Sequence, residues 1–416
     1  MIASHLTKTV LTPTAAPRLY ELDGLRVTVF GLLILYHTGM LYVAGWDFHY
    51  KSQYQSEALA NLMLWSNQWR MSLLFLISGA ALALFLPRNA TWKKVSIRLG
   101  HLLAPLLFGM LVVVVPQVYI EAKSKHMIEG LDYWQFWYAY LDQGSAEFEG
   151  HKSLGSMHLT WNHLWYLPYL FVYTLILAAI YPLLRNQWMQ SISRRLAKHA
   201  TPAHLVLLPI VVFYLNGAML YANNPVTHNL VDDWFNHGRS FFSFVLGFTL
   251  VQIPNLWSKV KTIRWHLLIA GMFSYAYIVF AFHGGKLGDG VIAQEFNGLL
   301  WNTNSWLWIL CVVAWGQQWF TFNNPLIRYL NSGVFCFYIL HQTLIIIFAY
   351  GLTPLKLGGF WEPLMVIVLS ILGCWILFEM IKPIPGLRFL MGTNTHVKVN
   401  DASKATSPIR AQLSAP

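Results

Sequence analysis

Long runs of apolar residues, separated by short polar segments, dominate this sequence from about residue 25 onward. A helix rises about 1.5 Å per residue, so a hydrocarbon core about 30 Å thick requires roughly 20 mostly apolar residues. Ten segments meet this requirement: 25–45, 59–86, 102–121, 163–184, 203–222, 238–254, 266–282, 297–319, 333–350 and 362–381. Because lipid offers no hydrogen bonds to the backbone, each segment is expected to be a helix. The pattern predicts an all-α polytopic membrane bundle of about ten transmembrane helices.

The composition supports a membrane protein and sets the expected domain limits. Of the 416 residues, 56% are hydrophobic and only 11% are charged, whereas soluble domains carry roughly 25% charged residues. Segments 1–24 and 383–416 are polar, so we expect a cytoplasmic N-terminal segment, a membrane domain over 25–382 and a largely disordered cytoplasmic tail. The three cysteines fall inside predicted spans without metal-ligand spacing, so no metal site is expected.

The positive charge of the chain is best explained by its orientation in the membrane. The net charge is +11, which in a soluble protein would suggest a nucleic-acid partner. If the N-terminus lies inside, however, most of the 28 lysines and arginines fall in segments on the inner side. Inner loops enriched in Lys and Arg are the rule in membrane proteins. Both termini are therefore predicted to be cytoplasmic, with the lipid bilayer as partner and no nucleic acid.

The first predicted span, "LRVTVFGLLILYH", carries two ionisable residues, Arg26 and His37. A charge at the centre of a bilayer costs about 2.5 to 3.5 kcal/mol on insertion scales, so such residues are functional candidates. Their separation of eleven residues corresponds to three helical turns plus about 20°, and to about 16 Å along the axis. Both side chains therefore face one side of one helix, with Arg26 near the inner surface and His37 beyond the midplane.

Further polar candidates lie in other predicted spans. They are Arg70 and Asn67 in "WSNQWRMSLLFLISG", His163 and Trp165 in "WNHLWYL", His341 in "FYILHQ", and Glu379 near the inner end of the last span. Asn67 and Arg70 are three residues apart and so share a helix face, at a depth comparable with that of His37. Structural interpretations also exist: an interface residue for His163, a packing residue for His341, and an ion pair with Arg26 for Glu379. The sequence does not choose between these interpretations.

The longest predicted outer loop, 122–162, combines aromatic residues with acidic ones. The aromatic residues are Tyr133, Trp134, Phe136, Trp137, Tyr138 and Tyr140, and the acidic ones are Asp132, Asp142, Glu147 and Glu149. Such aromatic residues are typical of a belt at the membrane interface. They also suit a sugar-binding surface, where flat rings pack on pyranose C–H groups and carboxylates accept hydrogen bonds from hydroxyls. Both interpretations stay open at this point.

Four motifs, in this order, resemble the acyltransferase-3 family of ten-helix membrane acyltransferases. They are "LDGLRVTVFGLLILYH", "WRMSLLFLISG", "HLWYL" and "FYILHQ". The similarity runs from about Leu22 to Ile381, and the "WRM" and "NHLWYL" segments are most similar to the branch that contains periplasmic glucan-succinylating proteins. Each motif is short, but their order and spacing on a ten-span background are specific.

The resemblance implies that an acyl group, succinyl or acetyl, passes from cytoplasmic acyl-CoA to a hydroxyl of an extracytoplasmic glycan, in the bacterial inner membrane. Arg26 and His37 would be the family's essential arginine and histidine. No cofactor would be tightly bound; acyl-CoA would be the donor substrate and a carbohydrate the acceptor. A neutral His37 could take the proton of the attacking hydroxyl. Arg26 could bind CoA phosphate, and Arg70 an acyl carboxylate or the oxyanion.

A different class of function fits the same residues. In a proton-coupled transporter or flippase of a glycan or lipid-linked precursor, Arg26 and His37 would serve as a proton relay or as a counter-charge. Transporters often carry corresponding broken segments in an internal repeat, and no convincing pair is visible in the sequence. A structural scaffold in a glycan-assembly complex is a third alternative. Acyl-dependent mass gain on a glycan would distinguish the enzyme from both.

Overall fold

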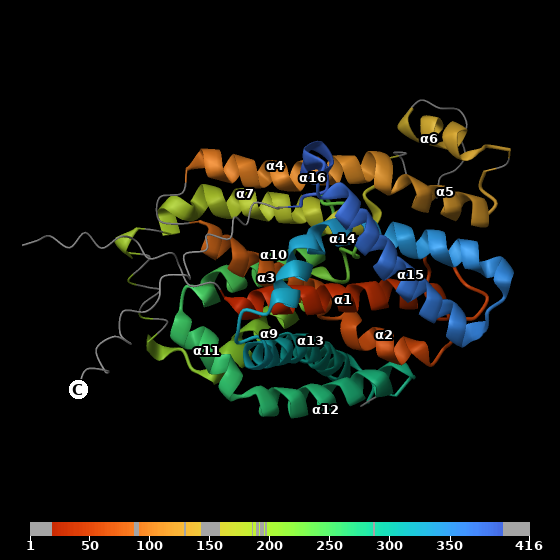
Figure 1. The fold of residues 1–416 in the computed structure, drawn as a ribbon. Coiled ribbons are helices and arrows are strands. Elements are labelled where there is room, and N and C mark those ends of the chain that lie inside the picture. Colours follow the sequence, from red (N-terminus) through yellow and green to blue (C-terminus); the bar gives the residue numbers. More distant parts are fainter. Residues whose placement is uncertain are drawn as a thin grey trace, which may run out of the picture.

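The computed structural model describes residues 19–86, 91–128, 130–142, 159–184, 186–188, 191, 195, 198–285 and 288–393. These residues form a bundle of helices that run side by side (Figure 1). The long helices are α1 (Tyr20–Tyr42), α3 (Arg70–Phe85), α4 (Trp92–Phe108), α7 (Tyr166–Leu184), α9 (Pro202–Leu220), α10 (Trp234–Val251), α12 (Arg264–Phe282), α13 (Val291–Trp319), α14 (Pro325–Leu352) and α15 (Gly358–Ile381). The expected N-terminal segment and tail fall mostly outside the described residues.

All ten predicted spans coincide with helical segments of the described chain, which confirms the all-α polytopic bundle. Eight helical stretches are long and apolar enough to cross a membrane, and α10 forms a ninth when joined to α11 (Pro254–Thr262). The remaining predicted segment, 297–319, lies in α13. Its polar residues Asn302, Asn304 and Gln317 are buried inside the bundle rather than facing lipid.

Helix α1 lies at the centre of the bundle, where it contacts α3, α13, α14 and α15 (Figure 1). Leu25, Val29, Leu33 and Leu41 along it are buried. Its first half carries Arg26, and its C-terminus leads into the segment that carries His49. We refer to these two ends of the bundle as the Arg26 end and the His49 end.

Two predicted spans are not continuous α-helices, which corrects the sequence analysis. The span 59–86 consists of α2 (Leu59–Asn67) and α3, with a break at Gln68 and Trp69. At this break, Arg239 Nη2 donates to the carbonyl oxygen of Gln68 at 3.0 Å, and Asn304 Nδ2 donates to its side-chain oxygen at 2.9 Å. These bonds from other helices stabilise an interruption that a hydropathy pattern does not reveal.

The span 102–121 contains a π-helical turn, η1 (Gly109–Val113), before α5 (Val115–Ser124). Pro116 lacks a backbone N–H and therefore leaves a helical carbonyl without its usual donor. Side chains supply donors instead: Trp137 Nε1 bonds the carbonyl of Leu111 at 2.9 Å, and Thr343 Oγ1 bonds that of Val113 at 2.7 Å. The π-helical turn determines how α5 is rotated about its own axis. It therefore also determines the direction in which the side chain of Gln117, the residue after Pro116, points.

Helices α3 and α10 pack with their backbones in contact. A Cβ atom on Gly79 would overlap the carbonyl oxygen of Phe244, and one on Gly247 would overlap that of Leu76. Glycine is therefore required at both positions, one on each helix, and the two helices interlock.

Candidate active site

Three histidines from distant parts of the chain meet inside the bundle. His37 lies on α1, His341 on α14, and His163 on the 3-10 turn η4 (Asn162–Trp165) that precedes α7. The ring centroids of His37 and His341 are 5.1 Å apart, and those of His163 and His341 are also 5.1 Å apart. His341 is completely buried, and His163 is 7% exposed. The structure thus brings together three of the residues singled out in the sequence.

The hydrogen bonds of two of these rings define their neutral tautomers. His341 Nδ1 lies 2.7 Å from the carbonyl oxygen of Tyr338, which can only accept, so Nδ1 carries the proton. His163 Nε2 lies 3.1 Å from the carbonyl oxygen of Ile339 and donates to it in the same way. Nε2 of His341 and Nδ1 of His37 are buried and have no hydrogen-bond partner among the described residues. Two ring nitrogens are therefore available to a substrate.

Arg70 lies beside this cluster as an unpaired buried cation. Its guanidinium carbon is 3.3 Å from the centroid of the Tyr36 ring, next to His37 in the chain, and its side chain is 8% exposed. Nη1 donates to Asn67 Oδ1 at 3.0 Å, which is the contact expected from their spacing, and Tyr36 donates to the same oxygen at 3.0 Å. No carboxylate within the described ranges forms an ion pair with Arg70. Such a cation favours binding of an anionic group.

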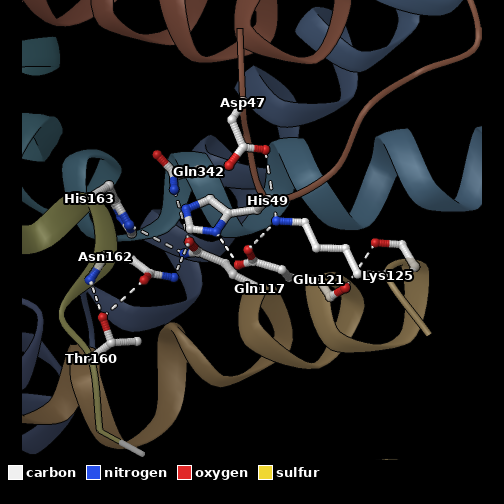
Figure 2. A network of polar contacts seen from close by, with 10 residues as sticks. Asp47, His49, Gln117, Glu121, Lys125, Thr160, Asn162, His163 and Gln342 are labelled. Carbon is white, nitrogen blue, oxygen red and sulfur yellow. Dashed lines mark hydrogen bonds and ion pairs between the residues drawn. The ribbon is translucent and has the colours of Figure 1, made fainter. Parts of the chain in front are cut away.

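Gln117 connects the histidine cluster to the His49 end (Figure 2). Its Nε2 donates to His163 Nδ1 at 3.2 Å and to Thr343 Oγ1 at 2.6 Å. Its Oε1 accepts from Asn162 Nδ2 at 3.3 Å and from Gln342 Nε2 at 3.0 Å. The Gln117 amide therefore uses both of its N–H donors and its oxygen acceptor. It bonds Nδ1 of His163 while the carbonyl of Ile339 bonds Nε2, so the ring is held at both nitrogens.

A fourth histidine, His49, forms a hydrogen bond through Nδ1 with a carboxylate oxygen of Glu121 on α5 (Figure 2). The other carboxylate oxygen of Glu121 accepts from Lys125 Nζ at 2.8 Å, and Lys125 lies 3.8 Å from Asp47. Although partial burial alone would lower the pKa of Lys125, the bond to Glu121 raises it above its usual value. His49 and Glu121 are 22% and 20% exposed, so this pair lies at the boundary between the cluster and solvent.

The segment 43–58, which carries His49, is attached to several helices. Lys51 Nζ donates to the carbonyl oxygens of Met40 at 2.8 Å and Val43 at 2.5 Å, at the end of α1. Ser52 donates to the buried carboxylate of Glu362 on α15 at 2.6 Å. The segment also places the Phe48 ring 6.3 Å from that of His37. It therefore covers the histidine cluster at the His49 end.

Trp165 lies in a second group of rings near Arg70. Its ring stacks on that of His228 with centroids 4.1 Å apart. His228 belongs to a connection that Asp233 holds in place, accepting from the backbone N–H groups of Thr227 at 3.0 Å and His228 at 3.1 Å. Burial lowers the pKa of His228, with a further contribution from Arg70, although Asp233 acts in the opposite direction. His228 is thus stabilised as a neutral ring against the tryptophan.

At the Arg26 end, Arg26 and Glu379 have separate partners. Arg26 Nη1 donates to Asn331 Oδ1 at 3.3 Å. Glu379 accepts from Tyr329 at 2.6 Å and pairs with Lys382 at 3.3 Å. The ion pair considered for Arg26 and Glu379 is not among the contacts of the described chain, because Lys382, one helical turn beyond Glu379, occupies that carboxylate.

The expected aromatic outer loop includes helix α6 (Tyr133–Leu141), which lies beyond α5 at the His49 end (Figure 1). The carboxylate of Asp132 caps this helix by accepting from two backbone N–H groups, so it is engaged in the fold. Trp134 and Tyr138 are 69% and 75% exposed. Exposed rings suit an interface belt and a sugar surface equally, and Glu147 and Glu149 lie outside the described residues.

Comparison with known proteins gives the family of this chain. The family described as "Acyltransferase domain" matches residues 19–379, which includes all of α1 to α14 and most of α15. The chain belongs to the acyltransferase-3 family.

Relatives of this acyltransferase match along nearly its whole length. Glucans biosynthesis protein C of Shigella dysenteriae serotype 1 (strain Sd197) is 23% identical over 409 residues, covering 95% of this chain and 100% of the relative. Proteins of the same name from Escherichia coli O81 (strain ED1a) and Escherichia coli (strain K12) are 23% identical over 405 residues, with the same coverage. No solved structure matched. The protein is therefore an integral membrane O-acyltransferase of a family whose relatives include glucan biosynthesis proteins.

For an acyltransferase, the cluster offers the two kinds of group that the reaction requires. Imidazole nitrogens without partners can accept a proton from an attacking hydroxyl. An unpaired guanidinium beside them can stabilise the oxyanion that develops on the carbonyl. Within the described ranges, no group of three or more His, Cys, Asp or Glu side chains is arranged to hold a metal ion.

Three polar residues of the site were not identified from the sequence: His49, Gln117 and Glu121. His49 lies in a connection without helical periodicity, so nothing indicated its direction. Gln117 and Glu121 lie on one helix and are four residues apart, a spacing that places them on a common face. That spacing, directly after Pro116, is the signal that could have pointed to them.

Proposed function

We propose that this acyltransferase transfers a succinyl or acetyl group from acyl-CoA, on the cytoplasmic side, to a hydroxyl of a glycan outside the bacterial inner membrane. The observation that supports this most directly is the pair of unpartnered ring nitrogens of His37 and His341 beside the unpaired Arg70. The name of the relatives, Glucans biosynthesis protein C, suggests a glucan as acceptor. The excess of basic residues in the segments of the Arg26 end suggests that this end is cytoplasmic.

In the proposed mechanism, the acceptor hydroxyl attacks the thioester carbonyl while His37 takes its proton. The new C–O bond gives a tetrahedral intermediate whose oxyanion is stabilised by Arg70. The C–S bond then breaks, its electron pair stays on sulfur, and the CoA thiolate leaves toward the Arg26 end. Arg26 binds the anionic part of CoA, and about 16 Å along α1 separates it from His37. The extended arm of CoA has to bridge this distance.

The family membership favours this enzyme over the transporter or flippase considered above. A direct test is to incubate the purified protein with acyl-CoA and a glucan acceptor and to measure the mass gain of the acceptor. We expect ester formation with the wild type, and an unchanged rate for His283→Gln, which alters an exposed histidine remote from the cluster. If neither succinyl-CoA nor acetyl-CoA produces an ester on any glucan tested, the proposal is wrong.

A further inference from the structure

No carboxylate of the described chain pairs with His37 to stabilise its protonated form. Its ring neighbours are His341, Phe48 and Tyr36, and Arg70 lies over the Tyr36 ring. A proton on His37 would therefore place a second positive charge beside a buried guanidinium, which is unfavourable without a counter-charge. A proton taken from the acceptor has to move on from this ring.

His49, by contrast, does contact a carboxylate. Its Nδ1 hydrogen-bonds Glu121, while the ring itself extends toward Gln342 and His163, into the polar network (Figure 2). The Phe48 ring is a neighbour of both histidines, 6.3 Å from the ring of His37 and 5.1 Å from that of His49.

His49 also has a connection to solvent. Its side chain and that of Glu121 are each about one fifth exposed, at 22% and 20%. Beyond them, Lys125 contacts Glu121 at 2.8 Å and Asp47 at 3.8 Å, and Asp47 is 92% exposed. The charged and titratable groups around His49 are therefore Glu121 on α5, Lys125 directly after α5, Asp47 on its own segment, His163 on η4 and His37 on α1.

We propose that His49 and Glu121 form a relay pair that receives the acceptor proton from His37 and releases it to solvent at the His49 end. This inference rests on the proposed function. In each turnover the acceptor O–H bond and the thioester C–S bond break, and the ester C–O bond forms. The acceptor proton passes through His37, and then through water or glycan hydroxyls, to His49 and out. The CoA thiolate takes its proton from water at the Arg26 end, so one proton is released at one face and one is consumed at the other.

The test uses proteoliposomes in which acyl-CoA is supplied at the Arg26 face and a glucan at the His49 face, with the pH of each face set separately. Ester formation is followed by mass spectrometry, and proton release at the His49 face by a pH-sensitive dye. The variants are Glu121→Gln and His49→Gln. Their matched controls are Glu295→Gln and His283→Gln, which change an exposed glutamate and an exposed histidine outside the segment 43–58.

For the wild type we expect one proton to be released at the His49 face for each ester formed. Glu121→Gln is expected to lower the rate on the order of tenfold or more. His49→Gln should lower the rate to a similar extent. Both variants should also lower the ratio of protons released at the His49 face to ester formed, and both controls should match the wild type.

Two results would overturn the relay. In the first, both variants keep the wild-type rate and the wild-type ratio of protons released to ester formed. In the second, both lose rate with an unchanged ratio, which indicates a structural role only. Thermal unfolding of each variant shows whether it is folded, and either variant alone suffices for the test. If the wild type forms no ester, the proposed function fails and the relay fails with it. If ester forms without proton release at the His49 face, only the relay fails.

Discussion

Arg26 and His37 belong to the same helix but lie in different electrostatic settings. Arg26 bonds Asn331 and Glu379 pairs with Lys382, while the nearby Arg98 is a second, partly buried cation at this end. Around His37, ring nitrogens are buried without partners among the described residues, and no carboxylate of the described chain pairs with Arg70. A buried polar group without a partner costs stability, so the missing partners are expected to come from the substrate. Under the proposed function, we expect the Arg26 end to bind the donor and the histidine cluster to perform the chemistry.

The strongest test of this comparison is His37→Ala. If His37 is the base, the turnover rate should fall on the order of 10² to 10⁴-fold, the range for a general base, with little change in KM for acyl-CoA. The measurement is kcat and KM for ester formation by folded protein, with His283→Gln as control. A wild-type turnover rate in His37→Ala would exclude His37 from the reaction.

Arg70→Gln should have the next largest effect. Loss of an oxyanion contact lowers kcat on the order of 10² to 10³-fold. If Arg70 instead binds a carboxylate of the acyl group, KM for a succinyl donor should rise while an acetyl donor is unaffected. Comparing the two donors in the same variant separates these roles, and no change with either donor would remove Arg70 from the site.

Gln117→Ala tests whether the network of the His49 end orients the cluster. The substitution leaves Asn162, Gln342 and Thr343 without one partner each, which should lower the free energy of unfolding by about 1 to 3 kcal/mol. The rate should fall by about tenfold because the His163 ring loses its orienting donor. Thermal unfolding and kcat are measured together; a stability loss with an unchanged rate would limit Gln117 to folding.

Arg26→Gln should act on donor binding rather than on turnover. Losing a charge-assisted contact to phosphate should raise KM for acyl-CoA by about tenfold, with kcat within a few-fold of the wild type. The KM of the wild type should also increase with salt more steeply than that of the variant. The opposite result, a lower kcat at unchanged KM, would place Arg26 in the chemical step.

Glu379→Gln should have the smallest effect. Its pair with Lys382 is about 40% exposed, and exposed ion pairs contribute at most about 1 kcal/mol. Both kcat and KM should remain within a factor of about two of the wild type. A large loss of activity would show that the matched polar groups of the Arg26 end do more than stabilise the fold.

The sequence predicts the features that depend only on residue positions within a single helix, such as helical segments and contacts between residues one turn apart. All ten apolar segments are helical, and Asn67 and Arg70 form the contact that their spacing indicates. Hydropathy could not reveal the break at Gln68, because Arg239 and Asn304 stabilise it from other helices.

Contacts between segments far apart in the chain were the main features that the sequence analysis did not predict. His163 and Gln117 are 46 residues apart, and Glu121 is 72 residues from His49. Periodicity indicates which face a residue occupies but not which neighbour that face meets. For the same reason, Arg26 and Glu379 were placed at one depth although they have different partners.

The interlocked glycines of α3 and α10 constrain how this enzyme accommodates its substrates. Because Gly79 and Gly247 each face a carbonyl of the opposite helix, α3 and α10 cannot slide past each other without a steric clash. Arg70 is the first residue of α3, so the packing of α3 against α10 also fixes the backbone position of Arg70 in the bundle. If Arg70 contacts the acyl group as proposed, we expect the length and shape of the acyl group to decide which donors react, since the backbone that carries the cation does not move.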